Sequence, residues 1–327
     1  MKTAFVTGAT GFVGSTLVDD LLDRGFSVKC ATRKSSDLRW LKDKDVQLCE
    51  VNLLDLDSIK EALRGCRYIF HLAGVLFASS EEEFIRGNVE ITENMVEAAI
   101  QSDTEIERFV LVSSIVAAGA SASGKPLVES DPCRPFTWYG KSKFASEKYV
   151  LSRKDMLPFT IIRPGAVFGP RDYAMFTAFQ MGKIGLNIIL GEKGKQGSII
   201  HVSDLSRGIL NAAFSDKAVG ETYFLANDKF IYQEDFVRTI IQIMGKNPKN
   251  IVIPYSVLMV AAYLSEFYSR IFKKKALLNQ QKMLEFREPY IVCSSEKAKR
   301  DFNFQQKISL EEGIKSTLAW YKENKWI

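Results

Sequence analysis

The stretch TGATGFVG at residues 7–14 places three glycines, Gly8, Gly11 and Gly14, between an apolar strand pattern and an amphipathic helical pattern. A glycine in the turn lets the backbone reverse, one at the helix start lets a pyrophosphate approach, and one inside the helix lets it pack on the strand. Free N–H groups and the positive end of the helix dipole then face the phosphates. A purely structural turn is the alternative, because the spacing is G-x-x-G-x-x-G. The position between strand and helix favours a dinucleotide site.

Short β-branched runs alternate with helical patterns over the first two thirds of the chain, as a parallel sheet with crossover helices requires. STLVDDLLDRG, with Gly25 as its C-cap, forms one βαβ unit with the flanking runs. Two long helices are predicted over residues 81–100 and 139–154. The six predicted strands are TAFVTG, SVKCAT, VQLCEV, YIFHLAG, RFVLVSS and FTIIRPG. The pattern predicts an α/β fold with a doubly wound parallel sheet.

The chain changes character after about Asp228, where helical patterns dominate and strands are few. No repeat or low-complexity linker separates the two regions. We predict a nucleotide-binding core over residues 1–165, to which 199–227 return. A smaller C-terminal substrate-binding lobe is predicted over 166–198 and 228–327.

The composition is that of an ordinary globular protein, with 327 residues, 46% hydrophobic and 25% charged. A net charge of +5 without dense basic blocks argues against nucleic-acid binding. The one charge run, FKKKA at 272–276, is read as a solvated helix end in preference to a phosphate or lipid patch. Five scattered cysteines indicate free thiols in a reducing compartment. With no leader pattern before Thr3 and no apolar stretch near ~20 residues, we expect a cytoplasmic protein without an integral membrane segment.

A candidate catalytic set follows from spacing. YGKSK puts Tyr139 and Lys143 at i and i+4, on one face of a helix. A nearby ammonium stabilises a phenolate and lowers its pKa from ~10, by 1 to 3 units. Ser114 ends a predicted strand, so its hydroxyl would lie at the carboxyl edge of the sheet and orient a substrate oxygen. Ser113 is the rival for this role.

TGATGFVG, HLAG, the set Ser114, Tyr139 and Lys143, and RPGAVFGP occur in the order typical of extended short-chain dehydrogenases/reductases. The chain most resembles the branch with dihydroflavonol reductases and 3β-hydroxysteroid dehydrogenases. IHVSDLSRGILNAA at 200–213 and SLEEGIKSTLAWYKENKW at 309–326 extend the resemblance over nearly the whole chain. It implies a Rossmann sheet, an NAD(P) cofactor and an oxidoreductase activity. The family's S-x-x-x-x-G pattern, counted back from Gly119, selects Ser114.

The resemblance also implies further cofactor contacts. VNLLD at 51–55 is similar to a loop that touches adenine, with Asn52 in place of the usual aspartate. HLAG would line the nucleotide cleft, and RPGAVFGP would wrap the nicotinamide end. The residues predicted to bind the cofactor are Gly8, Thr10, Gly11, Phe12, Val13, Gly14, Arg33, Lys34, Asn52, Leu53, Leu72, Ala73, Gly74, Asn88, Tyr139, Lys143, Pro164, Gly165 and Val167.

CATRKSS at 30–36 bears on the choice of cofactor. An acidic residue at the end of the second strand bonds the ribose hydroxyls of NAD and repels the 2′-phosphate of NADP, whereas a cation does the reverse. Arg33 can clamp a phosphate with its planar fork, and Lys34 adds donors. The sequence therefore predicts NADP(H) over NAD(H). The alternative is that both cations are solvated loop residues.

No metal site is predicted, because His71 and His201 are the only histidines and both lie in strand-like apolar contexts. No Cys/His or Ser/His/Asp arrangement supports a hydrolase. The favoured activity interconverts a ketone or aldehyde and a secondary alcohol. A nucleotide-sugar epimerase or dehydratase is the alternative, although KQGSIIHVSD lacks the arginine such enzymes carry there; Lys193 and Lys195 could substitute. A non-catalytic NADP-binding regulator is the third hypothesis.

Two segments suggest partners. The long helices after the fourth and fifth strands often pair across a two-fold axis in this superfamily, which predicts a homodimer; the alternative is that they only cover the sheet. PYSVLMVAAYLSEFYSRIFKKK at 254–275 has an unbroken apolar run from Val257 to Leu264. We predict that this segment helps form a largely apolar substrate pocket above the nicotinamide. Burial within the smaller lobe and a lipid contact aided by Lys273, Lys274 and Lys275 are the alternatives.

Overall fold

The computed structural model describes residues 2–272 and 280–327. Nearly all of the basic run FKKKA lies outside the described residues, and with it the lipid contact predicted for Lys273, Lys274 and Lys275. Among the described residues, no helix is both long and apolar enough to cross a bilayer.

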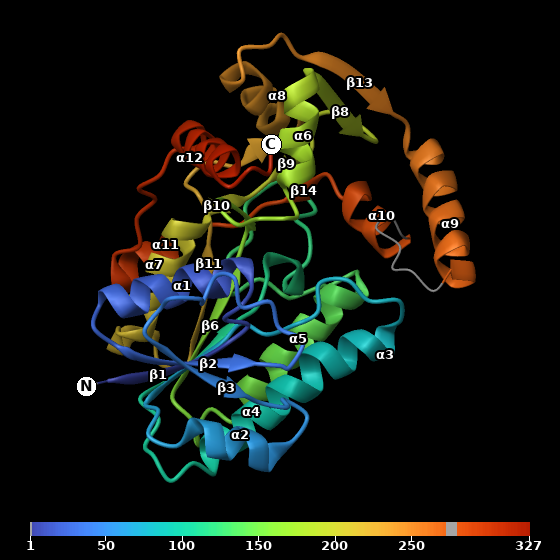
Figure 1. Cartoon of the computed structure of the whole chain (residues 1–327). Coiled ribbons are helices and arrows are strands. Elements are labelled where there is room, and N and C mark those ends of the chain that lie inside the picture. The colour runs from blue at the N-terminus through green and yellow to red at the C-terminus, as the bar shows by residue number, and fades with distance from the viewer. Residues whose placement is uncertain (1, 273–279) are drawn as a thin grey trace.

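A seven-stranded sheet of parallel strands forms the centre of the molecule (Figure 1), in the order β11-β6-β5-β4-β1-β2-β3. The strands are β1 (Thr3–Thr7), β2 (Ser27–Thr32), β3 (Val46–Glu50), β4 (Tyr68–His71), β5 (Arg108–Val112), β6 (Phe159–Pro164) and β11 (Glu221–Leu225). The six predicted strands are confirmed. The seventh, β11, was not predicted as a strand, because ETYFL is a short run without clear alternation. The strand order reverses between β1 and β4, and folds of this kind bind their ligands beyond the carboxyl ends of the strands at such a point.

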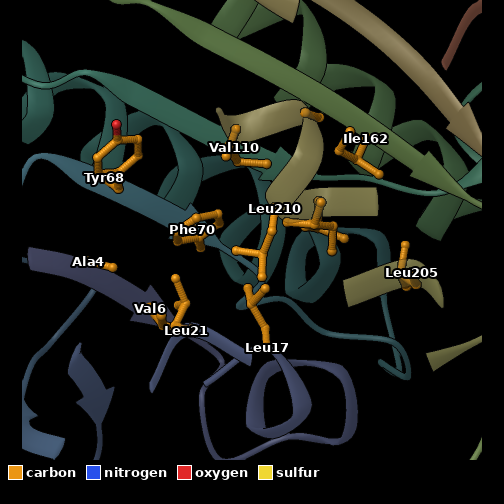
Figure 2. Close-up of a cluster of buried hydrophobic side chains, with 14 of the residues drawn as sticks. Ala4, Val6, Leu17, Leu21, Tyr68, Phe70, Val110, Ile162, Leu205 and Leu210 are labelled. Atoms are coloured by element: carbon orange, nitrogen blue, oxygen red, sulfur yellow. The ribbon is translucent and has the colours of Figure 1, made fainter. Parts of the chain in front are cut away.

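Helices cover both faces of the sheet, as the doubly wound prediction requires. One face carries α1 (Phe12–Asp23) and α7 (Val202–Ala213), and the other carries α2 (Leu56–Leu63), α4 (Ile91–Ile100) and α5 (Trp138–Ser152). Figure 2 shows how Leu17 and Leu21 of α1 and Leu210 of α7 meet below the strands. Burying each such leucine contributes about 1.5–3 kcal/mol. This packing fixes the strand ends that carry the site.

The helix predicted over 81–100 is interrupted. The segment is α3 (Glu81–Phe84), the π-helical turn η1 (Ile85–Glu90) and α4. Gly87 packs so tightly on the Val75 side chain that a Cβ would collide with it. The Asn88 amide accepts from the Val75 N–H at 2.6 Å and donates to the Val75 carbonyl at 3.1 Å. These two contacts hold the wider turn, and π turns often occur at functional sites.

Most of the remaining elements form small sheets and helices at one end of the main sheet (Figure 1), whereas α11 (Glu296–Phe302) lies beside α7 and β11. The short strands pair as β10–β7, β12-β9-β14 and β13–β8. Their bounds are β7 (Ala166–Phe168), β8 (Leu186–Leu190), β9 (Gln196–Gly197), β10 (Ile199–His201), β12 (Ile231–Tyr232), β13 (Lys249–Ile253) and β14 (Tyr290–Ile291). The helices are α6 (Phe176–Ile184), α8 (Gln233–Ile243), α9 (Tyr255–Phe272), α10 (Gln280–Arg287), α11 (Glu296–Phe302) and α12 (Leu310–Glu323), with 3-10 turns η2 (Ile115–Ala117) and η3 (Asp216–Ala218). The domain boundaries stay a prediction, since Phe302 and Phe304 of the later segment share the main core with α1.

Helices α9 and α10, which we call the α9 arm, have two unlike faces. Leu258 and Ala262 of α9 are buried against Met283 of α10. On the opposite face Val257, Val260 and Leu264 are 54%, 59% and 64% exposed. The apolar run is therefore only half buried.

Candidate active site

The glycine-rich turn follows β1, at the point where the strand order reverses between β1 and β4. Gly8 has φ +69°, a left-handed conformation that favours glycine, and a Cβ on Gly14 would collide with the Gly8 carbonyl. Gly11 is the N-cap of α1, with no side chain capping the helix and no acidic residue in its first turn. The first N–H groups of α1 are therefore open to an anion, as a pyrophosphate requires.

The end of β4 is held against this turn. The Leu72 and Ala73 N–H groups both donate to the Thr7 hydroxyl, at 3.1 Å and 3.0 Å. A Cβ on Gly74 would lie 2.8 Å from Asn88 Oδ1 and 3.9 Å from Lys143 Nζ. The missing side chain therefore allows Gly74 to pack closely on the Asn88 amide. Of the other predicted contacts, Thr10, Phe12 and Val13 belong to the turn and the start of α1.

The loop after β2 presents two cations to solvent. Lys34 is 87% exposed, and its Nζ lies 3.9 Å from Glu50. The Arg33 N–H donates to Ser36 Oγ at 2.8 Å, which shapes the loop. Within residues 2–272 and 280–327, no hydrogen bond or ion pair holds the Arg33 guanidinium. This arrangement fits a receptor for a phosphate next to the first strand's turn.

The loop after β3 is shaped by its own side chains. Asn52 Oδ1 accepts from the Leu54 N–H at 3.1 Å, and Asn94 donates to the Leu53 carbonyl at 3.1 Å. The amide oxygen of Asn52 is therefore used within the loop, and its amide nitrogen is the group left for a cofactor.

Ser114 and Tyr139 are brought together. Ser114 follows β5, and Tyr139 lies in the first turn of α5, which begins after the N-cap Thr137. The Ser114 hydroxyl lies close enough to Tyr139 to favour its ionised form. Ser113 is buried, and its hydroxyl has no hydrogen-bond partner among the described residues. The geometry therefore pairs Ser114, and not its rival, with the phenol.

The pKa of Tyr139 is raised, against the expectation that a cation lowers it. Burial disfavours the phenolate more than the nearby Ser114 hydroxyl favours it. Tyr139 is thus a protonated phenol at neutral pH, which suits a proton donor.

Lys143 is buried below this pair. Its Nζ donates to the Val112 carbonyl at the end of β5, at 2.8 Å. Burial lowers the pKa of Lys143 to about 8, while the Glu147 carboxylate acts in the opposite direction. In the described structure the ammonium bonds the strand end and lies beside Gly74, and it makes no hydrogen bond to the Tyr139 phenol.

A buried ion pair behind Lys143 was missed. The Arg163 guanidinium of β6 contacts the Glu147 carboxylate at 2.6 Å and 3.0 Å, and the side chains are 5% and 0% exposed. The signal was in the sequence, because Tyr139, Lys143 and Glu147 follow one another at i+4 along one helix face. The pair ties α5 to the sheet.

RPGAVFGP runs from β6 of the central sheet into β7 of a two-stranded sheet. Pro164 is the last residue of β6, and Val167 lies in β7 and packs on the main core. A Cβ on Gly165 would lie 2.6 Å from the Ser198 carbonyl. The glycine therefore permits a close backbone crossing, whether or not it also touches the cofactor.

Apolar side chains lie around Tyr139 and on the segment before α4. The Phe84 ring lies 6.1 Å from the Tyr139 ring. The segment from β4 to η1 exposes Leu76, Phe77 and Ile85. Gln281 of α10 accepts a hydrogen bond from the Trp138 N–H at 2.9 Å, so the α9 arm reaches the start of the catalytic helix.

Among the described residues, no group of three or more His, Cys, Asp or Glu side chains could hold a metal. All five cysteines are free thiols.

Comparisons with known proteins agree with this geometry. The sequence model of the NAD dependent epimerase/dehydratase family matches residues 4–226. A 4-hydroxy-2-methyl-3-oxo-4-farnesyl-3,4-dihydroquinoline-1-oxide ketoreductase from Stigmatella aurantiaca is 27% identical, covering 96% of this chain and 95% of the relative. A 3β-hydroxysteroid dehydrogenase/Δ5→4-isomerase from Mycobacterium tuberculosis is also 27% identical, with 97% and 89% covered. In fold, the chain is similar to UDP-glucose 4-epimerase from Thermotoga maritima, with a TM-score of 0.80, 21% identity and 99% of both chains covered.

Proposed function

The chain belongs to the NAD dependent epimerase/dehydratase family and is an NAD(P)-dependent oxidoreductase, and we propose that it interconverts a ketone or aldehyde and a secondary alcohol on a hydrophobic small molecule. The observation that carries this proposal is the Ser114–Tyr139 pair at the carboxyl edge of β5, next to the glycine-rich turn. The pair can address one substrate oxygen from two sides.

The roles of the side chains follow from their chemistry. A bound nicotinamide supplies the hydride that adds to the carbonyl carbon. The Ser114 hydroxyl orients the carbonyl oxygen. Tyr139, protonated at neutral pH, donates its proton to that oxygen, and the product is the alcohol. Lys143, fixed on the Val112 carbonyl, contributes positive charge close to the developing oxyanion.

The region where sugar-nucleotide enzymes would carry an arginine supports the apolar substrate. Ser198, Ile199 and Ile200 are buried, and Ser198 is hydrogen-bonded to the Cys293 N–H at 3.0 Å. Lys195 donates to the carbonyls of Leu190 and Phe286, so it is engaged in the structure. Of the two lysines that could replace the arginine, only Lys193 is exposed and available to a diphosphate. The curated relatives act, by name, on a farnesylated quinoline oxide and on steroids.

The test is NADPH consumption on a panel of aromatic, steroid-like and long-chain ketones, with UDP- and dTDP-sugars as competitors. We expect turnover of at least one apolar ketone, and thermal protection by that ketone but not by the sugars. Protection by sugars alone would put the epimerase or dehydratase alternative in its place. Cofactor binding without turnover of any compound favours the regulator.

We also propose NADP(H) as the preferred cofactor, supported by the free Arg33 guanidinium and the exposed Lys34. Arg33→Ala should raise the KM for NADPH by about 10-fold or more and leave that for NADH within about twofold, since a charged contact is worth roughly 1.5–3 kcal/mol. Arg64→Ala, a surface arginine after α2, is the matched control. A wild-type preference for NADH, unmoved by Arg33→Ala, contradicts the proposal.

A cytoplasmic homodimer built through α4 and α5 remains part of the proposal. Both helices pack on the same face of the sheet and on each other. Light scattering at micromolar concentration should give twice the mass of the chain, and a monomer mass rejects the dimer.

A further inference from the structure

Two buried side chains meet where the strand order reverses. Thr7 ends β1 and His71 ends β4, and the two are direct partners in the sheet register. Both are 0% exposed. Thr7 Oγ1 lies 2.8 Å from His71 Nδ1, immediately beneath the glycine-rich turn.

The direction of this hydrogen bond follows from counting donors. Thr7 Oγ1 already accepts the Leu72 and Ala73 N–H groups, which use both of its lone pairs. Its own proton is then donated to His71 Nδ1, so this ring nitrogen is unprotonated. The proton of the neutral ring is on Nε2, which lies 3.1 Å from Thr92 Oγ1. His71 is therefore the Nε2–H tautomer.

The same direction continues to the catalytic helix. Thr92 accepts from His71 and donates to the Asn88 carbonyl at 2.6 Å. That carbonyl also accepts from Ser146 Oγ at 3.0 Å, and the Asn88 amide donates to Ser142 Oγ at 2.9 Å. Ser142 and Ser146 lie on α5 on either side of Lys143. A continuous path thus joins the turn to α5.

We propose that His71 is a positioning residue for the hydride-transfer reaction: as a neutral Nε2–H ring it links Thr7 under the glycine-rich turn, through Thr92, to the Asn88 that holds α5. This inference rests on the proposed oxidoreductase site. His71 does not touch the reacting atoms. It fixes the π turn η1, and Asn88 in turn fixes the register of α5, on which Tyr139 and Lys143 stand.

The path requires a neutral ring. An imidazolium would donate from Nδ1 toward Thr7 Oγ1, which would then face three donors and would lose its acceptor for its own proton. Burial lowers the pKa of His71 to about 3, and the Lys143 charge acts in the same direction. The ring therefore stays neutral wherever the protein is folded and active.

The first test removes one hydroxyl from the path. Thr92→Val keeps the side-chain shape but removes the hydroxyl that bonds both His71 and the Asn88 carbonyl. Thr92→Ser keeps the hydroxyl. We expect Thr92→Val to lower kcat by about 10-fold or more through misplacement of α5, with KM and the Kd for NADPH within about twofold. Thr92→Ser should restore kcat to within about twofold. Equal kcat values for wild type and Thr92→Val at full folding overturn the proposal.

The second test needs no turnover. The chain has only two histidines, so ¹⁵N-histidine NMR of wild type and His201→Gln assigns the His71 ring directly. We expect Nε2 protonated and Nδ1 bare, without titration from pH 5 to 9. An Nδ1–H ring or an imidazolium at pH 6 overturns the proposal even if no ketone is reduced. If the ring shows the expected tautomer but no ketone is reduced, the proposed function is wrong and the assignment of the His71 ring stands.

Discussion

The carboxyl end of the sheet at β1 and β4 and the α9 arm differ in how their side chains are packed. At the sheet edge, His71, Asn88 and Lys143 are buried and each polar group has a partner at a defined distance. On the α9 arm, three large apolar side chains face outward on one helix side. The difference indicates that the carboxyl end of the sheet depends on one arrangement of its side chains. Buried polar groups need partners in one arrangement, whereas exposed apolar side chains can be placed in many ways.

The largest effect on kcat should come from the hydroxyl of Tyr139, at the start of α5. Tyr139→Phe removes the proton donor, so kcat should fall by about 10²–10⁴ with the melting temperature nearly unchanged. Tyr263→Phe removes an exposed hydroxyl on the α9 arm and is the matched control, with kcat within about twofold. Steady-state kinetics checks both. A loss below threefold for Tyr139→Phe would break the comparison.

Next in size is the buried ion pair. Glu147→Gln leaves the Arg163 charge without its partner in the interior, and the free energy of unfolding should fall by about 3–5 kcal/mol. Glu311→Gln breaks an exposed pair with Lys315 on α12 and should cost less than about 1 kcal/mol. Urea denaturation of the two variants provides the measurement. Similar losses would mean that burial does not set the difference.

The stability losses on the two sides of α9 should differ less than those of the two ion pairs. Leu258→Ala empties a site against α10 and should cost the arm about 2–4 kcal/mol, while Val260→Ala on the exposed side should change it by no more than about 0.5 kcal/mol. Hydrogen exchange of α9 and α10 amides is the measurement, because the arm can open without the sheet. A large cost at Val260 would show that something covers this face in solution.

The remaining prediction concerns acid sensitivity. Burial lowers the pKa of His71 to about 3 and that of His201 to about 4, so below pH 6.5 the unfolded chain binds protons that the folded chain does not. The histidines' contribution is complete above pH 6.5 and is lost as pH falls, by at most about 1.4 kcal/mol per pH unit each.

Asp172 acts with the opposite sign in this range. Burial raises the pKa of Asp172 to about 6, so its folded form holds a proton that the unfolded form releases, and its contribution falls as pH rises from 3.8 to 6. Asp172→Asn should therefore steepen the acid loss seen in urea titrations at pH 4.5, 5.5 and 6.5. No acid loss in this variant would contradict the buried neutral histidines.

The features found from the sequence are those that local pattern encodes. β-branched runs gave six strands, and i+4 spacing gave the face of α5 that carries Tyr139 and Lys143. The π turn at Asn88 was missed, because it arises from Val75 and Gly87 meeting in space. The same holds for the raised pKa of Tyr139, since the burial that causes it comes from distant segments. The short strands after β6 were missed because two to five residues carry no readable period.

The strand order also determines when each strand can pair with its neighbours during synthesis on the ribosome. β1 has both of its neighbours, β2 and β4, once residue 71 has emerged, but β6 must wait for β11 at residues 221–225. At roughly 5–20 residues per second, β6 spends several seconds as an open edge. Such an edge can pair with another nascent chain. An isolated N-terminal half that stops before residue 221 would keep that edge permanently, so any attempt to produce the nucleotide-binding half alone should extend at least through Leu225.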